Sequence, residues 1–210
     1  MQYITGKGLG KMINHKHKFL FIHIPKTAGR SIEKYFHSVG IYADDEAGKY
    51  KDVTGSQYDE TLIEPHLLPQ DYLDIYGESI LSYFWFCFVR NPFERAVSEY
   101  FYSLDKKLIN SSFEQFLEKK EIKNYTYKNH ELKQLDFILN EKKIFDFIGR
   151  FENFKPDFNL LLKKLDLPYK DCPHINQSNH VNYRNYYNEK TRNFISVYYK
   201  EDLSYFNYGF

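Results

Sequence analysis

The chain has 210 residues, which suffice for one α/β domain with a full hydrophobic core but are few for two. Hydrophobic residues make up 42% and charged residues 27% of it, as in ordinary soluble globular proteins. The formal net charge of +1 lacks the basic excess of nucleic-acid-binding proteins, so we expect no nucleic-acid partner.

The beginning of the chain, residues 1–18, is polar and contains no apolar signal-peptide core. The longest strongly apolar run, 83–89, is far shorter than the ~20 residues that a membrane-spanning helix needs. We therefore expect a cytoplasmic protein without a transmembrane segment. Because no Pro-, Gly- or Ser-rich linker divides the chain, we expect a single domain over 1–210, with 1–17 as a flexible or peripheral N-terminal segment.

Three short apolar runs predict buried strands at 19–24, 84–89 and 144–148. Near-continuous apolarity, rather than alternation, is typical of a strand that is covered on both faces, which favours a parallel sheet. Strands of this kind that alternate with helices indicate an α/β fold, with a central, mainly parallel sheet flanked by helices.

Apolar residues recur at helical spacing after each of these strands. The three stripes are Ile32, Tyr35, Phe36 and Val39; Phe93, Ala96, Val97, Tyr100, Phe101 and Leu104; and Phe158, Leu161, Leu162 and Leu165. Further helices are expected over 112–120, 131–139 and 189–199.

The turn between the first strand and its helix has the composition of an anion-binding loop. It consists of Pro25, Lys26, Thr27, Ala28, Gly29, Arg30 and Ser31. Small residues let backbone N–H groups approach an anion, and the helix N-terminus adds about half a positive charge. Lys26 supplies a full charge, and the hydroxyls of Thr27 and Ser31 add donors. The loop is not a Walker A motif, because its lysine precedes the glycine. An ordinary strand–helix turn with a solvated lysine fits it equally well.

The second strand ends at Arg90, and signals for a helix start follow it. Asn91 is a good N-cap, Pro92 suits the first helical position, and Glu94 stands where a capping box has its acid. Arg90 lies at the carboxyl end of a buried strand, where α/β sheets bind their ligands. Together with Ser98 it can grip one phosphate through its bidentate fork. The alternative is that Arg90 pairs with a carboxylate and Ser98 is a surface residue.

Taken together, these segments resemble the carbohydrate sulfotransferase family of Golgi and bacterial type. Its hallmarks are a P-K-T-x-G-x-S loop and an F-x-F-V-R-N-P-[FYW]-x-R-x-x-S block, which stand here at 25–31 and 86–98. Residues 148–153, 173–176 and the tail with Asp202 look similar too. The resemblance implies a P-loop-NTPase-like three-layer fold. It also implies the donor 3'-phosphoadenosine 5'-phosphosulfate, with 3',5'-adenosine bisphosphate as product and no required metal.

The resemblance also implies roles for single residues. In the family the first loop binds the 5'-phosphosulfate, which here falls to residues 25–31. The Arg and Ser of the second block bind the 3'-phosphate, which falls to Arg90 and Ser98. Arg30 is a departure, since relatives often carry a smaller residue there.

Two further elements have expected ligand contacts. The loop with His174 and Asn176 resembles one that faces the cofactor or the acceptor in relatives, so it is a possible ligand loop. Arg95 either faces the acceptor or braces Glu99 one helical turn away.

Sulfuryl transfer needs in-line geometry and stabilisation of the charge that develops on the leaving oxygen. Lys26, beside the bridging oxygen of the donor, is expected to provide that stabilisation. The acceptor hydroxyl also needs a base, and histidine is the side chain best matched to neutral pH. His66 is the expected base, because family members similarly place a histidine before their second motif; Glu64 is the alternative.

The expected function is therefore transfer of a sulfuryl group to a hydroxyl, in the first place of a saccharide or glycan. Tyrosine, a lipid-linked sugar and a small metabolite stay open as acceptors, and the sequence carries no signal of oligomeric state. A P-loop nucleotide kinase or related phosphotransferase is the first alternative, although the Walker A order is absent. A non-catalytic adenine-nucleotide-binding module is the second. No metal site is expected.

Overall fold

The computed structural model describes residues 12–41, 66–119, 129–170 and 181–210. Its centre is a four-stranded sheet in the order β1-β2-β3-β4, formed by β1 (Met12–Asn14), β2 (Phe19–Phe21), β3 (Phe84–Val89) and β4 (Phe147–Arg150). Strands β2, β3 and β4 run parallel, and β1 pairs antiparallel with β2 at the edge. The chain therefore has a mixed α/β fold around a mostly parallel sheet.

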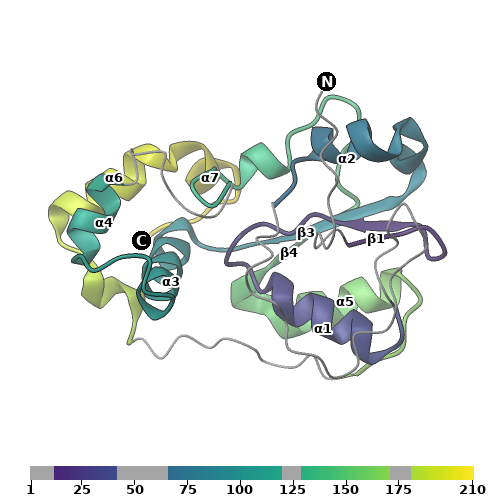
Figure 1. Cartoon of the computed structure of the whole chain (residues 1–210), viewed down its shortest axis with the longest axis horizontal. Coiled ribbons are helices and arrows are strands. Elements are labelled where there is room, and N and C mark those ends of the chain that lie inside the picture. Colours follow the sequence, from purple (N-terminus) through teal and green to yellow (C-terminus); the bar gives the residue numbers. More distant parts are fainter. Residues whose placement is uncertain (1–11, 42–65, 120–128, 171–180) are drawn as a thin grey trace.

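Helices cover both faces of this sheet (Figure 1). Helices α1 (Gly29–Ser38) and α5 (Phe154–Lys164) pack on one face, against alternate aromatic residues of the strands. These are Phe19, Phe21, Phe86 and Phe88. Helix α2 (Pro69–Tyr76) and the 3-10 helix η1 (Glu78–Ser82) cover the other face, to which Leu20, Trp85, Cys87 and Val89 point. Coverage of both faces explains why the strand sequences are apolar without alternation.

A second group of helices lies beyond the carboxyl end of β3, at the left of Figure 1. It contains α3 (Pro92–Asp105), α4 (Phe113–Lys119), α6 (Glu189–Tyr198) and α7 (Lys200–Tyr205). Apolar and aromatic side chains fill its core, among them Phe93, Val97, Phe113, Phe116, Ile195 and Tyr199. Burial of each such large side chain contributes about 1.5–3 kcal/mol, so this core holds the helices together.

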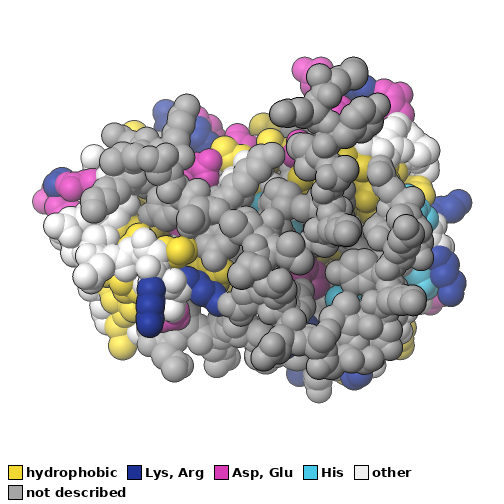
Figure 2. All heavy atoms as spheres, in the orientation of Figure 1, with side chains coloured by type: hydrophobic (Ala, Val, Ile, Leu, Met, Phe, Trp, Pro, Cys, Tyr) yellow, Lys and Arg dark blue, Asp and Glu magenta, His cyan; other side chains and the backbone are white. Residues whose placement is uncertain are grey.

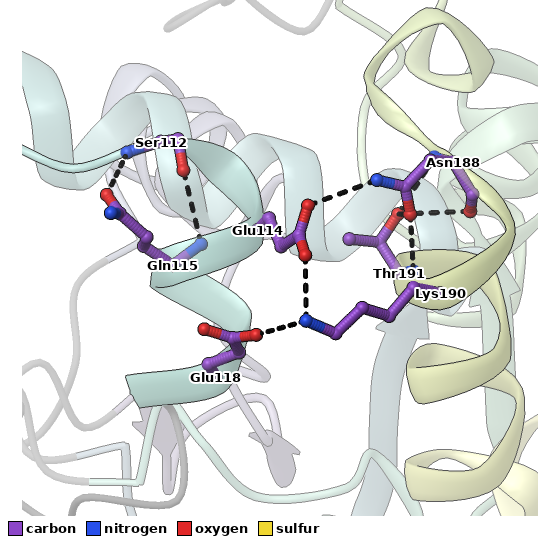
Figure 3. A network of polar contacts seen from close by, with 7 residues as sticks. All are labelled: Ser112, Glu114, Gln115, Glu118, Asn188, Lys190 and Thr191. Atoms are coloured by element: carbon purple, nitrogen blue, oxygen red, sulfur yellow. Dashed lines mark hydrogen bonds and ion pairs between the residues drawn. The ribbon is translucent and has the colours of Figure 1, made fainter.

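Polar contacts join α4 to α6 at the surface of this group (Figure 3). The ammonium of Lys190 lies 2.8 Å from Glu114 and 2.5 Å from Glu118. Asn188, whose side chain caps α6, donates a hydrogen bond of 3.1 Å to Glu114. Because these groups are exposed, solvent screens the attraction, and the network orients the two helices more than it stabilises them. Acidic and basic side chains of the described residues are also interspersed around the rim of the face in Figure 2.

The strand predictions agree best where both faces are covered. Strand β3 has the predicted bounds, and β2 is shorter than the predicted 19–24. Strand β4 begins later than predicted: Ile144 is 89% exposed, and the strand pairing starts at Phe147. The Asp146 backbone N–H donates to the carbonyl of Trp85, and its carboxylate accepts the N–H of the same residue.

The helix predicted over 131–139 is wrong. The structure has turns there and only a short 3-10 helix, η2 (Leu135–Phe137). The cause is a tertiary contact: the carboxylate of Asp202 accepts the backbone N–H groups of Gln134 and Leu135, at 2.8 and 3.0 Å. Those N–H groups therefore do not donate to the carbonyls of a preceding helical turn.

Three elements had no sequence signal that predicts them. Helices α2 and α7 are short, and β1 lies inside the segment 1–17, which the composition describes only as peripheral. Within the described ranges, none of the helices has both the length and the apolarity that crossing a membrane requires.

The contact between Gly149 and Phe88 yields a test of the sheet packing. These residues are paired across β4 and β3, and a Cβ atom on Gly149 would overlap the Phe88 ring. We expect Gly149→Ala to lower the free energy of unfolding by about 1–3 kcal/mol, because the ring must leave its packed position. Urea denaturation measures this change. Gly209→Ala is the matched control, since an added methyl there meets nothing, and equal stability of both variants would contradict the packing described.

Candidate functional site

The ends of β2 and β3 bring the two motif segments together. The strands are parallel neighbours, and a further backbone bond from Ile22 to Phe86 extends their pairing toward the carboxyl edge. Beyond that edge, Nη1 of Arg90 donates to the backbone carbonyl of Lys26 at 3.2 Å. The loop at 25–31 and the end of β3 therefore form one surface.

The loop has an unusual backbone conformation. Lys26 and Ala28 have positive φ angles of 68° and 75°, which cost non-glycine residues on the order of 1–3 kcal/mol. Left-handed residues next to ordinary ones turn successive N–H groups to one side, which makes a concave anion site. The hydroxyl of Thr27 donates to the carbonyl of Ile24 at 2.8 Å, so its proton braces the loop instead of facing a ligand.

Helix α1 starts from this loop with an open N-terminus. Its N-cap is Ala28, which has no capping side chain, and its first turn contains no acidic residue. The N–H groups of Ser31 and Ile32 both bond to the Ala28 carbonyl. Among the described residues, no carbonyl accepts the N–H groups of Ala28 and Gly29. The positive end of the helix is thus available to an anion.

Gly29 is required for a reason that the sequence does not reveal. A Cβ atom at this position would overlap the imidazole of His23, which lies under the loop. Nδ1 of His23 is held 2.9 Å from the carboxylate of Glu33, on the next turn of α1. The glycine therefore provides space for the partly buried His23, in addition to access for an anion.

Lys26 lies half-buried at the mouth of the loop. Its ammonium sits 3.8 Å from the ring centroid of Tyr102, a cation–π contact, and it forms no ion pair with a described residue. Burial lowers its pKa to about 8; the nearby Glu99 carboxylate opposes this shift, and the charges of Arg90 and Arg30 add to it. A bound anion would favour the charged form again.

Arg90 is buried and only partly paired. Nη2 contacts the carboxylate of Glu94 at 2.9 Å, and the guanidinium lies 3.8 Å above the ring of Phe151. Nε is buried as well, and in the described part of the chain it has no hydrogen-bond partner. The carboxylate pairing that the sequence leaves open is therefore present, together with one N–H that no described residue accepts. Ser98 is buried on the same face of α3, about 6 Å beyond Glu94 along the helix axis.

The predicted capping role of Glu94 is wrong. Asn91 is the N-cap of α3, as expected, and its side chain accepts the N–H of Phe93 at 3.0 Å. The reciprocal bond, however, comes from Glu152, which accepts the backbone N–H of Asn91 at 2.5 Å. Glu94 is drawn away because it pairs with Arg90.

His66 is one of three imidazoles that cluster next to the loop. Its Nδ1 is 2.7 Å from the carbonyl of His23, and because a carbonyl only accepts, this nitrogen carries the proton. The rings of His23 and His130 lie 4.6 and 4.7 Å from it. Burial lowers the pKa of His66 well below its usual value, and these two neighbours add to the effect. The ring is therefore neutral at pH 7, with the lone pair on Nε2.

His130 and Glu99 also shape the site, although neither belongs to the two motifs, and the motif residue Arg95 supports it from α3. Nδ1 of His130 lies 3.0 Å from both carboxylate oxygens of Glu99, and both residues are buried. In the described part of the chain Arg95 does not brace Glu99. It donates instead to the carbonyls of Pro25, Leu132 and His130, at 3.1, 3.0 and 3.3 Å. Arg95 thus ties the anion-binding loop to the segment that carries His130.

Some predicted residues lie outside the described part of the chain. These are Glu64 and the possible ligand loop with His174 and Asn176. Within the described ranges, no group of three or more His, Cys, Asp or Glu side chains is placed to hold a metal ion.

Comparisons with other proteins agree with the motif pattern. A model of the sulfotransferase family matches residues 10–209 of the chain. The chain is also 38% identical over 105 residues to an uncharacterized protein of Archaeoglobus fulgidus, a match that covers 49% of this chain and 84% of that relative. No solved structure matches the chain.

The unusual environment of Lys26 is open to direct measurement. We expect its ammonium to titrate with a pKa of about 8, whereas Lys142, whose pKa is raised by a hydrogen bond to Glu78, stays protonated throughout this range. Carbon NMR of the lysine Cε groups follows both residues, and Lys26→Arg identifies the Lys26 signal. Glu99→Gln should lower the value of Lys26 further, since the carboxylate raises it. A Lys26 titration near the ordinary 10.5 would contradict the buried environment described.

Proposed function

Because the chain belongs to the sulfotransferase family, we propose that it transfers a sulfuryl group from 3'-phosphoadenosine 5'-phosphosulfate to a hydroxyl group of a saccharide or glycan. The observation that carries the donor assignment is the pair of anion sites at neighbouring strand ends. One is the open N-terminus of α1 with Lys26, and the other is Arg90 with its unused Nε. A donor with phosphate groups at both ends of its ribose matches such a pair.

The arrangement supports a P-loop-NTPase-like fold around the donor. The loop at 25–31 connects a parallel strand to a helix N-terminus, as phosphate-binding loops do. In this assignment the N–H groups of Ala28 and Gly29 and the side chains of Lys26 and Ser31 bind the 5'-phosphosulfate. Arg90, through Nε, and Ser98 bind the 3'-phosphate.

Lys26 then stabilises the leaving group. As the bond from sulfur to the bridging oxygen breaks, negative charge develops on the phosphate that departs. The donor's own charge raises the lowered pKa of Lys26 again, so the ammonium is protonated when it is needed. Its contact with Tyr102 holds the side chain at the mouth of the loop until then.

His66 accepts the proton of the acceptor hydroxyl. Its Nδ1–H is fixed on the His23 carbonyl, so Nε2 is the basic nitrogen of the neutral ring. Among the described residues none forms a hydrogen bond with Nε2. The hydroxyl oxygen attacks sulfur, its proton moves to Nε2, and the sulfur–oxygen bond of the donor breaks on the opposite side. The choice of a saccharide acceptor rests on the resemblance of the two motifs to carbohydrate sulfotransferases.

Nucleotide preference separates this proposal from a kinase. We expect 3',5'-adenosine bisphosphate to raise the melting temperature by several degrees at concentrations far above its Kd, because it binds only the folded chain. ATP with magnesium should give a smaller shift, because ATP has no 3'-phosphate to bind Arg90 and Ser98. Thermal-shift titrations measure both. Preference for ATP, or magnesium-dependent ATP turnover, would support the phosphotransferase alternative instead.

Substitutions separate catalysis from binding. His66→Ala should reduce the rate of labelled sulfate transfer to an active saccharide by about 10²–10⁴-fold and leave bisphosphate binding intact. Lys26→Ala should also abolish most transfer. His17→Ala is the control and should keep full transfer, because its exposed ring lies in the turn after β1 and not among the site residues. Full transfer by Lys26→Ala would overturn the mechanism, and unchanged behaviour of His66→Ala would favour a non-catalytic nucleotide-binding module.

A further inference from the structure

The backbone of Arg90 is held by the side chain of a residue far away in sequence. The N–H of Arg90 donates to Oε1 of Gln134 at 2.8 Å, and Nε2 of Gln134 donates to the carbonyl of Arg90 at 2.8 Å. One side-chain amide thus satisfies both polar backbone groups of the residue that follows β3. Gln134 is fully buried, and this two-bond clamp takes the place of a paired strand at that position.

Gln134 is itself fixed by a buried carboxylate. Asp202, on α7, accepts the backbone N–H groups of Gln134 and Leu135, each with one carboxylate oxygen. Bonds to an ionised acceptor are roughly twice as strong as neutral ones. Asp202 has no exposed surface, so its position is determined by these contacts. A continuous chain of hydrogen bonds therefore runs from α7 through Gln134 to Arg90.

The side chain of Arg90 also has little conformational freedom. Nη1 is bonded to the Lys26 carbonyl, Nη2 to Glu94, and the plane of the guanidinium rests on Phe151. A buried N–H without a partner is costly, and Nε has no partner among the described residues, so a ligand atom is the group that would complete it. A small displacement of the backbone would misalign this N–H, because the guanidinium is a rigid fork.

We propose that Gln134, locked by Asp202, is a positioning residue that determines the specificity for the 3'-phosphate of the donor. Gln134 does not touch the nucleotide. It sets the backbone of Arg90 so that Nε is presented to the 3'-phosphate, and the C-terminal helix α7 thereby becomes part of donor recognition. This inference rests on the proposed function, since it assigns the 3'-phosphate to Arg90.

A selectivity ratio tests the inference. Calorimetry on the full chain gives the Kd of adenosine 5'-monophosphate and that of 3',5'-adenosine bisphosphate, and their ratio reports the contribution of the 3'-phosphate alone. Gln134→Met keeps the length of the side chain and removes both hydrogen bonds, so the ratio should fall about tenfold, the effect of one charge-assisted hydrogen bond. Asp202→Asn, which offers one carbonyl oxygen for two N–H groups, should lower the ratio by a smaller factor.

The ratio distinguishes positioning from a general loss of structure. A partly unfolded variant binds both nucleotides less well by the same factor, so its ratio is unchanged; the milder Asp202→Asn variant provides the measurement if Gln134→Met does not fold. Gln70→Met, in an exposed side chain of α2 that bonds to Asp74, is the matched control and should keep the wild-type ratio. Wild-type ratios in the folded Gln134 and Asp202 variants would overturn the inference. A ratio near one in the wild-type protein would instead overturn the donor assignment on which it rests.

Discussion

The hydrogen bond from Arg90 to the carbonyl of Lys26 joins the ends of two parallel strands, and the rest of the site is arranged around it. It exists because β2 and β3 are neighbours in register, so that both chains leave the sheet at the same edge. At that edge one chain enters a left-handed loop and the other enters helix α3. Two cationic side chains therefore lie side by side, although 64 positions separate them in sequence.

Buried side chains hold this edge in place before any ligand binds. Arg95 donates a hydrogen bond to the carbonyl of Pro25. Gln134 forms hydrogen bonds with the backbone of Arg90, and Asp202 accepts the backbone N–H of Gln134. Polar groups fixed in this way do not need to reorganise when charge develops, which is the main source of electrostatic stabilisation in enzymes. The two groups assigned to chemistry, Lys26 and His66, have pKa values lowered by burial. In the proposed mechanism, Lys26 regains its proton when the anionic donor binds, and His66 is neutral and can accept a proton.

The sequence predicted well where local patterns and tertiary structure agree. The bounds of β3 and the N-cap at Asn91 follow from apolar runs and from backbone donors that need partners, and both are found as expected. The predictions from sequence failed where a residue distant in sequence forms the hydrogen bond that a local group was expected to form. Glu94 left its predicted cap for Arg90, and the helix expected around Gln134 is replaced by turns because Asp202 binds its N–H groups. A contact between residues 68 positions apart leaves no periodic signal.

The site shows the same division. The motif residues of both loops could be proposed as a site because each residue type has a local reason to lie at a strand end. The clustering of His66 with His23 and His130 could not, since these rings come from three separate segments and only the fold brings them together. Gly29 was expected because a small residue lets the backbone approach an anion. The structure adds a second reason, since a Cβ atom there would overlap the imidazole of His23.

The left-handed residues Lys26 and Ala28 have a consequence for the kinetics of association. The folded chain bears their conformational strain in the absence of an anion, so binding does not have to impose the left-handed conformation. A ligand then loses little affinity to loop ordering, and its approach resembles the docking of two rigid bodies. On-rates should consequently be governed by diffusion and by the positive field at the strand ends rather than by a slow closing step.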